Sequence, residues 1–299
     1  MNLKPSAVLF ACLAPLQASA NIDIVFDYSY DSFNFFADPG RKSLLEAAAS
    51  VFESRIGDSL TAINPTGSNH FQVNFADPAN TTGSITPATT QYQVAANDII
   101  IYVGGASLTG SAVGEGGPGG YSSSGSQVFL DNAATRGQTG VTTDTDFSLW
   151  GGSIRFNKDY GNWFFDSTLA TDDDISGVDF YSVAVHEIAH VLGFGTADSW
   201  DHWVTGTTFD GPNTLPTALT NDAAHWADGT TSTINSLGSF EAAMDPSINT
   251  GTRKNMTDLD WNGMRDIGWQ VSAVPEPQTW AMLLAGLGVV GALAGRRRA

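Results

Sequence analysis

A His-Glu-x-x-His pentad occupies residues 186–190 of this 299-residue chain. Residues four apart lie on the same side of a helix, so His186 and His190 can direct their imidazole nitrogens at one metal ion. Glu187 lies beside them, where it can take a proton from a water molecule that the ion activates. Two unrelated surface histidines would be the alternative explanation, but the surrounding segment has helical spacing and a capping residue at each end. The pattern therefore predicts a zinc site.

Two histidines do not complete such a site, because a catalytic zinc ion normally has three protein ligands and keeps a fourth position for water. Gly193 follows the pentad and allows a positive φ, so the chain can bend there and bring a later residue to the metal. The residues alone leave three candidates for the third ligand: His202, His225, or the carboxylate of Asp198 or Asp201.

The segment 186–193, HEIAHVLG, resembles the metzincin zinc endopeptidases. The third histidine of the usual metzincin motif comes six residues after the second, where this chain has Thr196. His225 precedes a tryptophan, and the tripeptide at 244–246, Met-Asp-Pro, resembles the Met-turn that lies beneath the metal in that family. This order, with an insertion before the third histidine, is similar to the leishmanolysin-like variant. The resemblance implies His225 as the third zinc ligand and keeps His202 as the alternative.

The same resemblance implies a zinc-dependent endopeptidase. Zinc would activate water and polarise the scissile carbonyl, Glu187 would carry the proton to the leaving amine, and Met244 would shape the floor of the site. Residue 246 is proline, so the tyrosine that some metzincins place there is absent. Two alternatives remain open: a noncatalytic cell-surface or biofilm-matrix protein with a structural metal site, and a zinc hydrolase acting on substrates other than peptides. Glu187 favours an enzyme, because a structural site needs no base.

Strands and helices alternate irregularly along the chain, which predicts an α+β fold. Alternating or continuous apolar residues predict strands over 21–33, 70–75, 97–105 and 151–165. Helical spacing predicts helices over 41–57, 179–193 and 255–269, the second with Asp179 as its N-cap and Gly193 just past its end. Residues 104–140 are rich in glycine and serine and are expected to be surface loops. The strand at 151–157 is expected to be a sheet edge that pairs with an extended peptide substrate.

The resemblance adds detail to this fold class. It implies one zinc peptidase domain over residues 21–272, with a mixed twisted sheet, an N-terminal helix and the active-site helix in an upper lobe. A smaller, irregular C-terminal lobe would contain the Met-turn and the final helix.

The chain is strongly acidic. Of its 13 basic and 31 acidic residues, nine and 30 lie between positions 21 and 274, so that segment has a net charge of −21. Nucleic acid is excluded as a partner, because binding phosphates needs a basic surface. The acidity suits the solubility of an exported protein, and calcium sites built from clustered carboxylates are the alternative. Calcium is therefore a secondary prediction, beside the zinc ion that the histidine pattern predicts.

Both ends of the chain carry targeting features. Residues 1–20 have a lysine, an apolar run and a terminal Ala-Ser-Ala, which predicts a signal peptide. Residues 273–299 contain Pro-Glu-Pro, an apolar run over 280–294 and three arginines, which predicts a short membrane helix with a basic flank. This tail resembles the PEP-CTERM sorting signal. The resemblance implies an exosortase as partner, export across the inner membrane of a Gram-negative bacterium, transient anchoring by the tail, and a surface-attached or released product.

Overall fold

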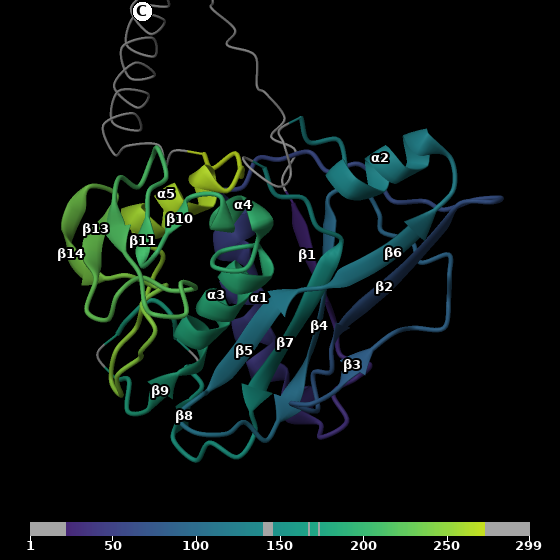
Figure 1. The fold of residues 1–299 in the computed structure, drawn as a ribbon. Coiled ribbons are helices and arrows are strands. Elements are labelled where there is room, and N and C mark those ends of the chain that lie inside the picture. Colours follow the sequence, from purple (N-terminus) through teal and green to yellow (C-terminus); the bar gives the residue numbers. More distant parts are fainter. Residues whose placement is uncertain (1–21, 140–145, 167, 173, 273–299) are drawn as a thin grey trace, which may run out of the picture.

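The computed structural model describes residues 22–139, 146–166, 168–172 and 174–272. The predicted signal peptide and the predicted membrane helix lie outside these residues. The described part contains several small sheets and a few helices, so the α+β class is confirmed. Figure 1 shows the largest sheet on one side of a central helix, α3 (Phe180–Val191), and the shorter C-terminal elements on the other.

The largest sheet has the strand order β1-β4-β7-β5. Its strands β1 (Asp23–Asp27), β4 (Asp98–Ala106) and β7 (Gly151–Asn157) are parallel, and β5 (Gly114–Pro118) runs antiparallel to β7. Successive side chains of β4 point to opposite faces. Ile99, Ile101 and Val103 belong to the main core, whereas Tyr102 packs in a second core on the other face. The sheet is therefore covered on both sides at its centre.

One face of this sheet carries α1 (Pro39–Glu53), the 3₁₀ turn η1 (Phe35–Ala37) and α3. Asp38 caps α1 by accepting a hydrogen bond from the Gly40 backbone, and Pro39 suits the first helical position. The helix predicted over 41–57 ends at Glu53, and Ile56 forms a β-bridge with Val271. Both helices bury their apolar sides against the sheet and against each other.

The opposite face carries a second sheet and a helix. The helix and one strand of that sheet come from residues 104–140, whose composition predicts surface loops. That prediction for residues 104–140 was wrong. The segment contains the strand β5, the strand β6 (Gly120–Ser124) and the helix α2 (Gln127–Thr135). β6 pairs with β2 (His70–Ala76), which also pairs with β3 (Ser84–Ile85). Backbone pairing with β7 and β2 holds β5 and β6 in the sheets. Their residues are mostly glycine and serine and show no apolar alternation.

The C-terminal part consists of short elements. β8 (Trp163–Phe164) and β9 (Val178–Asp179) pair just before α3. After α3 come α4 (Asp198–Asp201), then β10 (Val204–Thr205), β11 (Thr208–Phe209) and β12 (Thr217–Ala218), then the hairpin of β13 (Thr231–Ile234) and β14 (Leu237–Glu241), and finally α5 (Asp258–Asp266). Turns and loops join them, and these carry several residues of the site described next.

Among the described residues, no helix has the length and apolar character that crossing a membrane requires.

Candidate metal centre

Three histidines from two separate parts of the chain converge on one point. His186 and His190 lie one turn apart on α3, and His225 comes from the loop between β12 and β13. The Nε2 atom of His190 lies 3.0 Å from Nε2 of His186 and 3.0 Å from Nε2 of His225. One ligand atom from each ring lies within 4.8 Å of the others. Tetrahedral zinc with nitrogen ligands separates its ligand atoms by roughly 3.4 Å, so the spacing is close to that of a zinc site.

Both ends of α3 are fixed as the sequence predicts. The Asp179 side chain accepts a hydrogen bond from the Ser182 backbone at the N-terminus. At the C-terminus, Gly193 has a φ of 99°, and the backbone N–H of Phe194 bonds to the carbonyl of Ala189 at 3.0 Å. Gly193 N–H bonds in turn to the carbonyl of His190 at 3.1 Å, which completes a Schellman motif. This turn brings the Phe194 carbonyl back over the helix end, 2.8 Å from Nδ1 of His190.

Each histidine has an acceptor at its outer nitrogen. Nδ1 of His186 lies 2.8 Å from the carbonyl of Ala243, and Nδ1 of His225 lies 3.3 Å from the carboxylate of Asp222. A carbonyl or carboxylate oxygen can only accept, so every Nδ1 carries the hydrogen and every Nε2 presents a lone pair to the centre. Three lone pairs without a proton between them repel one another. A bound cation removes this repulsion, and three neutral imidazoles with oriented outer nitrogens suit zinc.

The electrostatic surroundings keep the helix histidines neutral. Burial, followed by the neighbouring histidines, holds the pKa of His186 well below its usual value. Burial and the proximity of His225 lower the pKa of His190 to about 4. A neutral imidazole is the form that binds a metal, so protons would compete only weakly with a metal ion at these two histidines near neutral pH.

The alternative ligands lie elsewhere. His202 is exposed at the C-terminal end of α4, and its ring makes an edge-to-face contact with Trp203 at 4.7 Å between centroids. Asp198 and Asp201 are exposed on α4. None of the three belongs to the converging group. Thr196, which occupies the usual third-ligand position, donates its hydroxyl to the carbonyl of His190 at 2.6 Å.

Glu187 is buried next to the histidine cluster, with 5% of its surface exposed. Burial raises the pKa of its carboxyl to about 8. A hydrogen bond from the Gly116 backbone N–H lowers this pKa in part, and the negative charge of Glu115 raises it. Burial therefore makes this carboxyl hold a proton more readily than an exposed glutamate does.

The cluster opens into a cleft of about 670 Å³. The three histidines and Glu187 line it together with residues 111–116 and 245–248. The strand beside the cleft is β5, which forms the end of the sheet. The prediction that residues 151–157 form the sheet edge was wrong, because that strand is β7, paired on both sides with β4 and β5.

Asp260 of α5 connects the segments that hold the cluster. Its fully buried carboxylate accepts hydrogen bonds from the indole of Trp226 at 2.8 Å and from the backbone of Ala243 and Met244 at 2.9 and 3.2 Å. It also forms a capping box with Thr257. Trp226 follows His225, and the Ala243 carbonyl orients His186. Met244 is fully buried in the main core, and its carbonyl accepts the backbone N–H of Trp226 at 3.1 Å.

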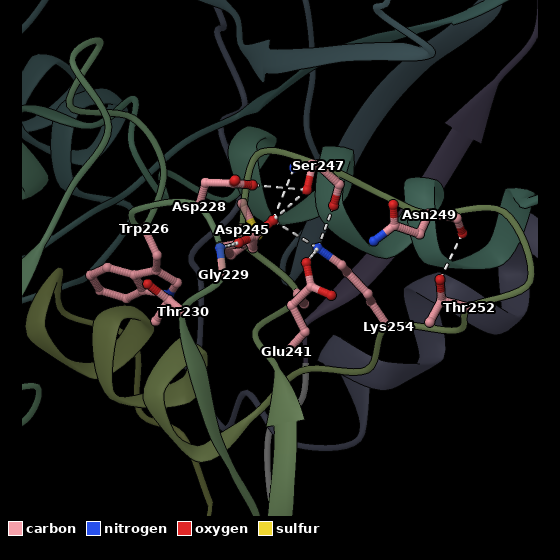
Figure 2. A network of polar contacts seen from close by, with 12 residues as sticks. Trp226, Asp228, Gly229, Thr230, Glu241, Asp245, Ser247, Asn249, Thr252 and Lys254 are labelled. Atoms are coloured by element: carbon pink, nitrogen blue, oxygen red, sulfur yellow. Dashed lines mark hydrogen bonds and ion pairs between the residues drawn. The ribbon is translucent and has the colours of Figure 1, made fainter.

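A buried lysine fixes the turn after Met244 (Figure 2). Nζ of Lys254, a residue with 4% exposure, lies 2.8 Å from Glu241 and 3.0 Å from Asp245, and it also donates to the Ser247 carbonyl. Asp245 in turn accepts the backbone N–H of Gly229 at 2.6 Å, in the loop that follows His225. Lys254 and Asp245 both line the cleft, so this network shapes one of its walls.

Sequence reasoning did not find Asp222, Lys254, Asp260 or the glycines of β5. Asp222 lies three residues before His225, a spacing that could have indicated a carboxylate partner for that ring. Lys254 acts through contacts with other segments and leaves no local pattern. Thr257 and Asp260 have the spacing of a capping box, but the contacts of Asp260 with Trp226, Ala243 and Met244 leave no such pattern. The glycine-rich composition of β5 predicts a loop and gives no sign of a strand.

Comparison with known proteins identifies the tail and nothing else. Residues 273–298 match the PEP-CTERM protein-sorting motif. The motif implies export of the protein and recognition of its C-terminal tail by an exosortase. No curated protein and no solved structure matches the chain.

Proposed function

We propose that residues 21–272 form a secreted zinc-dependent endopeptidase with a metzincin-like fold of the leishmanolysin-like type. The observation that carries the proposal is the joint position of Glu187 and the three histidines at one cleft. A structural zinc site is usually closed by four protein ligands and needs no adjacent base. Here three histidines converge, and a buried carboxyl lies beside them.

His186, His190 and His225 would hold the zinc ion, and their outer hydrogen bonds would keep each ring in the tautomer that binds it. When bound, zinc supplies Lewis-acid polarisation of the scissile carbonyl and activation of water. Glu187 would accept the proton from the attacking water and deliver it to the leaving nitrogen. Met244 and the turn that follows it would form the floor and wall of the site. Calcium binding stays a prediction from the acidic composition.

The substrate would bind as an extended peptide along β5. In the part of the chain that the structure describes, this strand pairs with β7 on one side, and its other side lies at the cleft. Backbone groups on a free strand edge pair readily with an extended chain, and such pairing does not depend on the side chains of the substrate. Unfolded protein segments are therefore the favoured substrate class. Export and sorting by the tail would place the enzyme at the cell envelope or outside the cell.

The test combines zinc stoichiometry with hydrolysis of casein, with and without a chelator. Wild-type protein should bind one zinc ion and cleave casein until the chelator is added. Glu187→Gln should bind zinc and lose hydrolysis. His225→Ala should lose both, whereas His202→Ala should keep both. Full activity of the Glu187→Gln variant would refute the proposed mechanism, and loss of zinc in the His202→Ala variant alone would refute the ligand assignment.

A further inference from the structure

Two glycines of β5 lie in direct contact with Glu187. A Cβ atom added to Gly114 would come within 2.6 Å of Oε1 and 2.8 Å of Cγ of Glu187. A Cβ atom added to Gly116 would come within 2.5 Å of the Glu187 carbonyl oxygen. Neither glycine has a positive φ. The requirement for glycine therefore comes from the close approach of strand and helix, not from an unusual backbone conformation.

Residues 115 and 117 of the strand do not share this contact. Gly117 has no atom within 4 Å of the position that a Cβ would occupy. Glu115 points elsewhere, and its carboxylate forms an ion pair with Arg155, accepting from Nε at 2.6 Å. Successive side chains of a strand alternate between its two faces. The glycines at 114 and 116 are thus those of the face that packs on α3.

We propose that Gly114 and Gly116 are positioning residues that set the location of the Glu187 carboxyl. The inference rests on the proposed function of Glu187 as the general base. Because these positions lack side chains, the backbone of β5 reaches the helix and forms the wall against which Glu187 lies. The strand then has two tasks, since the same edge would pair with the substrate. An extended peptide bound along β5 would be held at a fixed distance from the base.

A displaced base is expected to reduce the chemical step more than zinc or substrate binding. A misplacement of about 1 Å in a catalytic group can cost about 100-fold in rate. The full chain with Gly114→Ala should therefore lose at least about tenfold in kcat, with nearly unchanged KM and unchanged zinc affinity. Gly161→Ala is the control, because a Cβ atom added there would also meet no atom within 4 Å, and this variant should behave like wild type in all three measurements.

A second variant separates the effect of the contact with Glu187 from the effect of a contact with Val183. The added Cβ at position 114 would also lie 2.9 Å from Cγ1 of Val183. Combining Gly114→Ala with Val183→Ala relieves that contact and leaves the contact with Glu187. The double variant should keep the low kcat. Recovery of kcat would overturn the proposal, because the loss would then come from packing against Val183.

Crystal structures of the zinc-loaded Gly114→Ala and Gly161→Ala variants give a readout that does not depend on activity. The Glu187 carboxyl should move away from the histidine cluster in the first variant and stay in place in the second. An unmoved carboxyl, or a kcat loss equal in both variants, would overturn the inference. Absence of zinc binding and hydrolysis in wild-type protein would instead refute the proposed function. The position of the Glu187 carboxyl could still be compared between the two variants.

Discussion

The carboxylate of Asp222 lies 3.3 Å from Nδ1 of His225. His186 and His190 are oriented by backbone carbonyls, so His225 alone among the three histidines is oriented by a side chain. Asp222 is itself held in place, because it accepts the backbone N–H of Ala224 at 3.0 Å and the hydroxyl of Thr220. The orientation of the third histidine therefore depends on one carboxylate that can be replaced.

Replacing Asp222 should weaken zinc binding. Substituting the partner of a ligating histidine typically lowers metal affinity by about 10- to 100-fold, and we expect Asp222→Ala to fall in this range. Asp222→Asn keeps an acceptor but loses the negative charge, so its loss should be smaller. Zinc dissociation constants from competition with a chelator provide the measurement. Asp201→Asn, at an exposed position on α4, is the control, and equal zinc affinity in all variants would contradict the assigned role.

Asp260 should be required for both stability and zinc affinity. Asp260→Ala leaves the buried donors of Trp226, Ala243 and Met244 without their acceptor, and each such group costs about 1–3 kcal/mol. We expect the free energy of unfolding to fall by about 3 kcal/mol or more, and zinc to bind more weakly because the loops around His225 and Ala243 lose their common anchor. Denaturant unfolding and chelator competition measure the two effects.

The control for Asp260 is its neighbour Asp258. Its carboxylate accepts hydrogen bonds from Thr233, Asn235 and Ser236, all in the hairpin of β13 and β14. Asp258→Asn should therefore lower stability without changing zinc affinity. Equal losses of zinc affinity in both variants would show that the effect of Asp260 is general destabilisation.

The ion pair between Lys254 and Asp245 is buried, which makes the removal of one partner costly. Asp245 is 1% exposed, so Lys254→Met would leave its negative charge without its cation. Breaking a buried pair in this way typically costs about 3–5 kcal/mol. The double variant Lys254→Met/Asp245→Asn removes both charges and should be more stable than Lys254→Met alone. Thermal or denaturant unfolding of wild type and the two variants tests this order, and a double variant no more stable than Lys254→Met would contradict the coupling.

Asp58 should make stability fall as the pH rises through about 6. Burial, opposed by a hydrogen bond from the Gln270 backbone, raises the pKa of this carboxyl to about 6. The native state therefore binds the proton more tightly than the unfolded chain, in which the pKa is about 4. The stabilisation is complete below pH 4 and is lost as the pH rises past 6. A shift of about two units corresponds to roughly 3 kcal/mol as an upper limit.

Asp58→Asn tests this pH dependence. The amide oxygen can still accept the Gln270 N–H, but it carries no charge. The variant should be more stable than wild type by roughly 1–3 kcal/mol at pH 8, and this difference should shrink toward zero near pH 4. Denaturant unfolding across this range provides the measurement. A difference between the two proteins that does not vary with pH would contradict the explanation.

The amino-acid sequence by itself determined the helix that carries His186, Glu187 and His190. Helical spacing, the cap at Asp179 and the stop at Gly193 are local features, and local hydrogen bonds decide them. The continuous apolar run of β4 likewise indicates a strand at the centre of a sheet. These parts, and with them the α+β class, could be predicted because each depends on neighbours in sequence.

Tertiary structure decided which histidine joins the helix pair. In α4 the indole of Trp200 is fully buried and donates to the Ala223 carbonyl at 2.9 Å, which leaves His202 on the exposed side and fixes the loop before His225. Tertiary structure also decided that a glycine-rich segment forms the strand beside the cleft. Glycine is required there because Glu187, on another element, lies too close to leave room for a side chain. A requirement that comes from a residue distant in sequence leaves no periodic pattern.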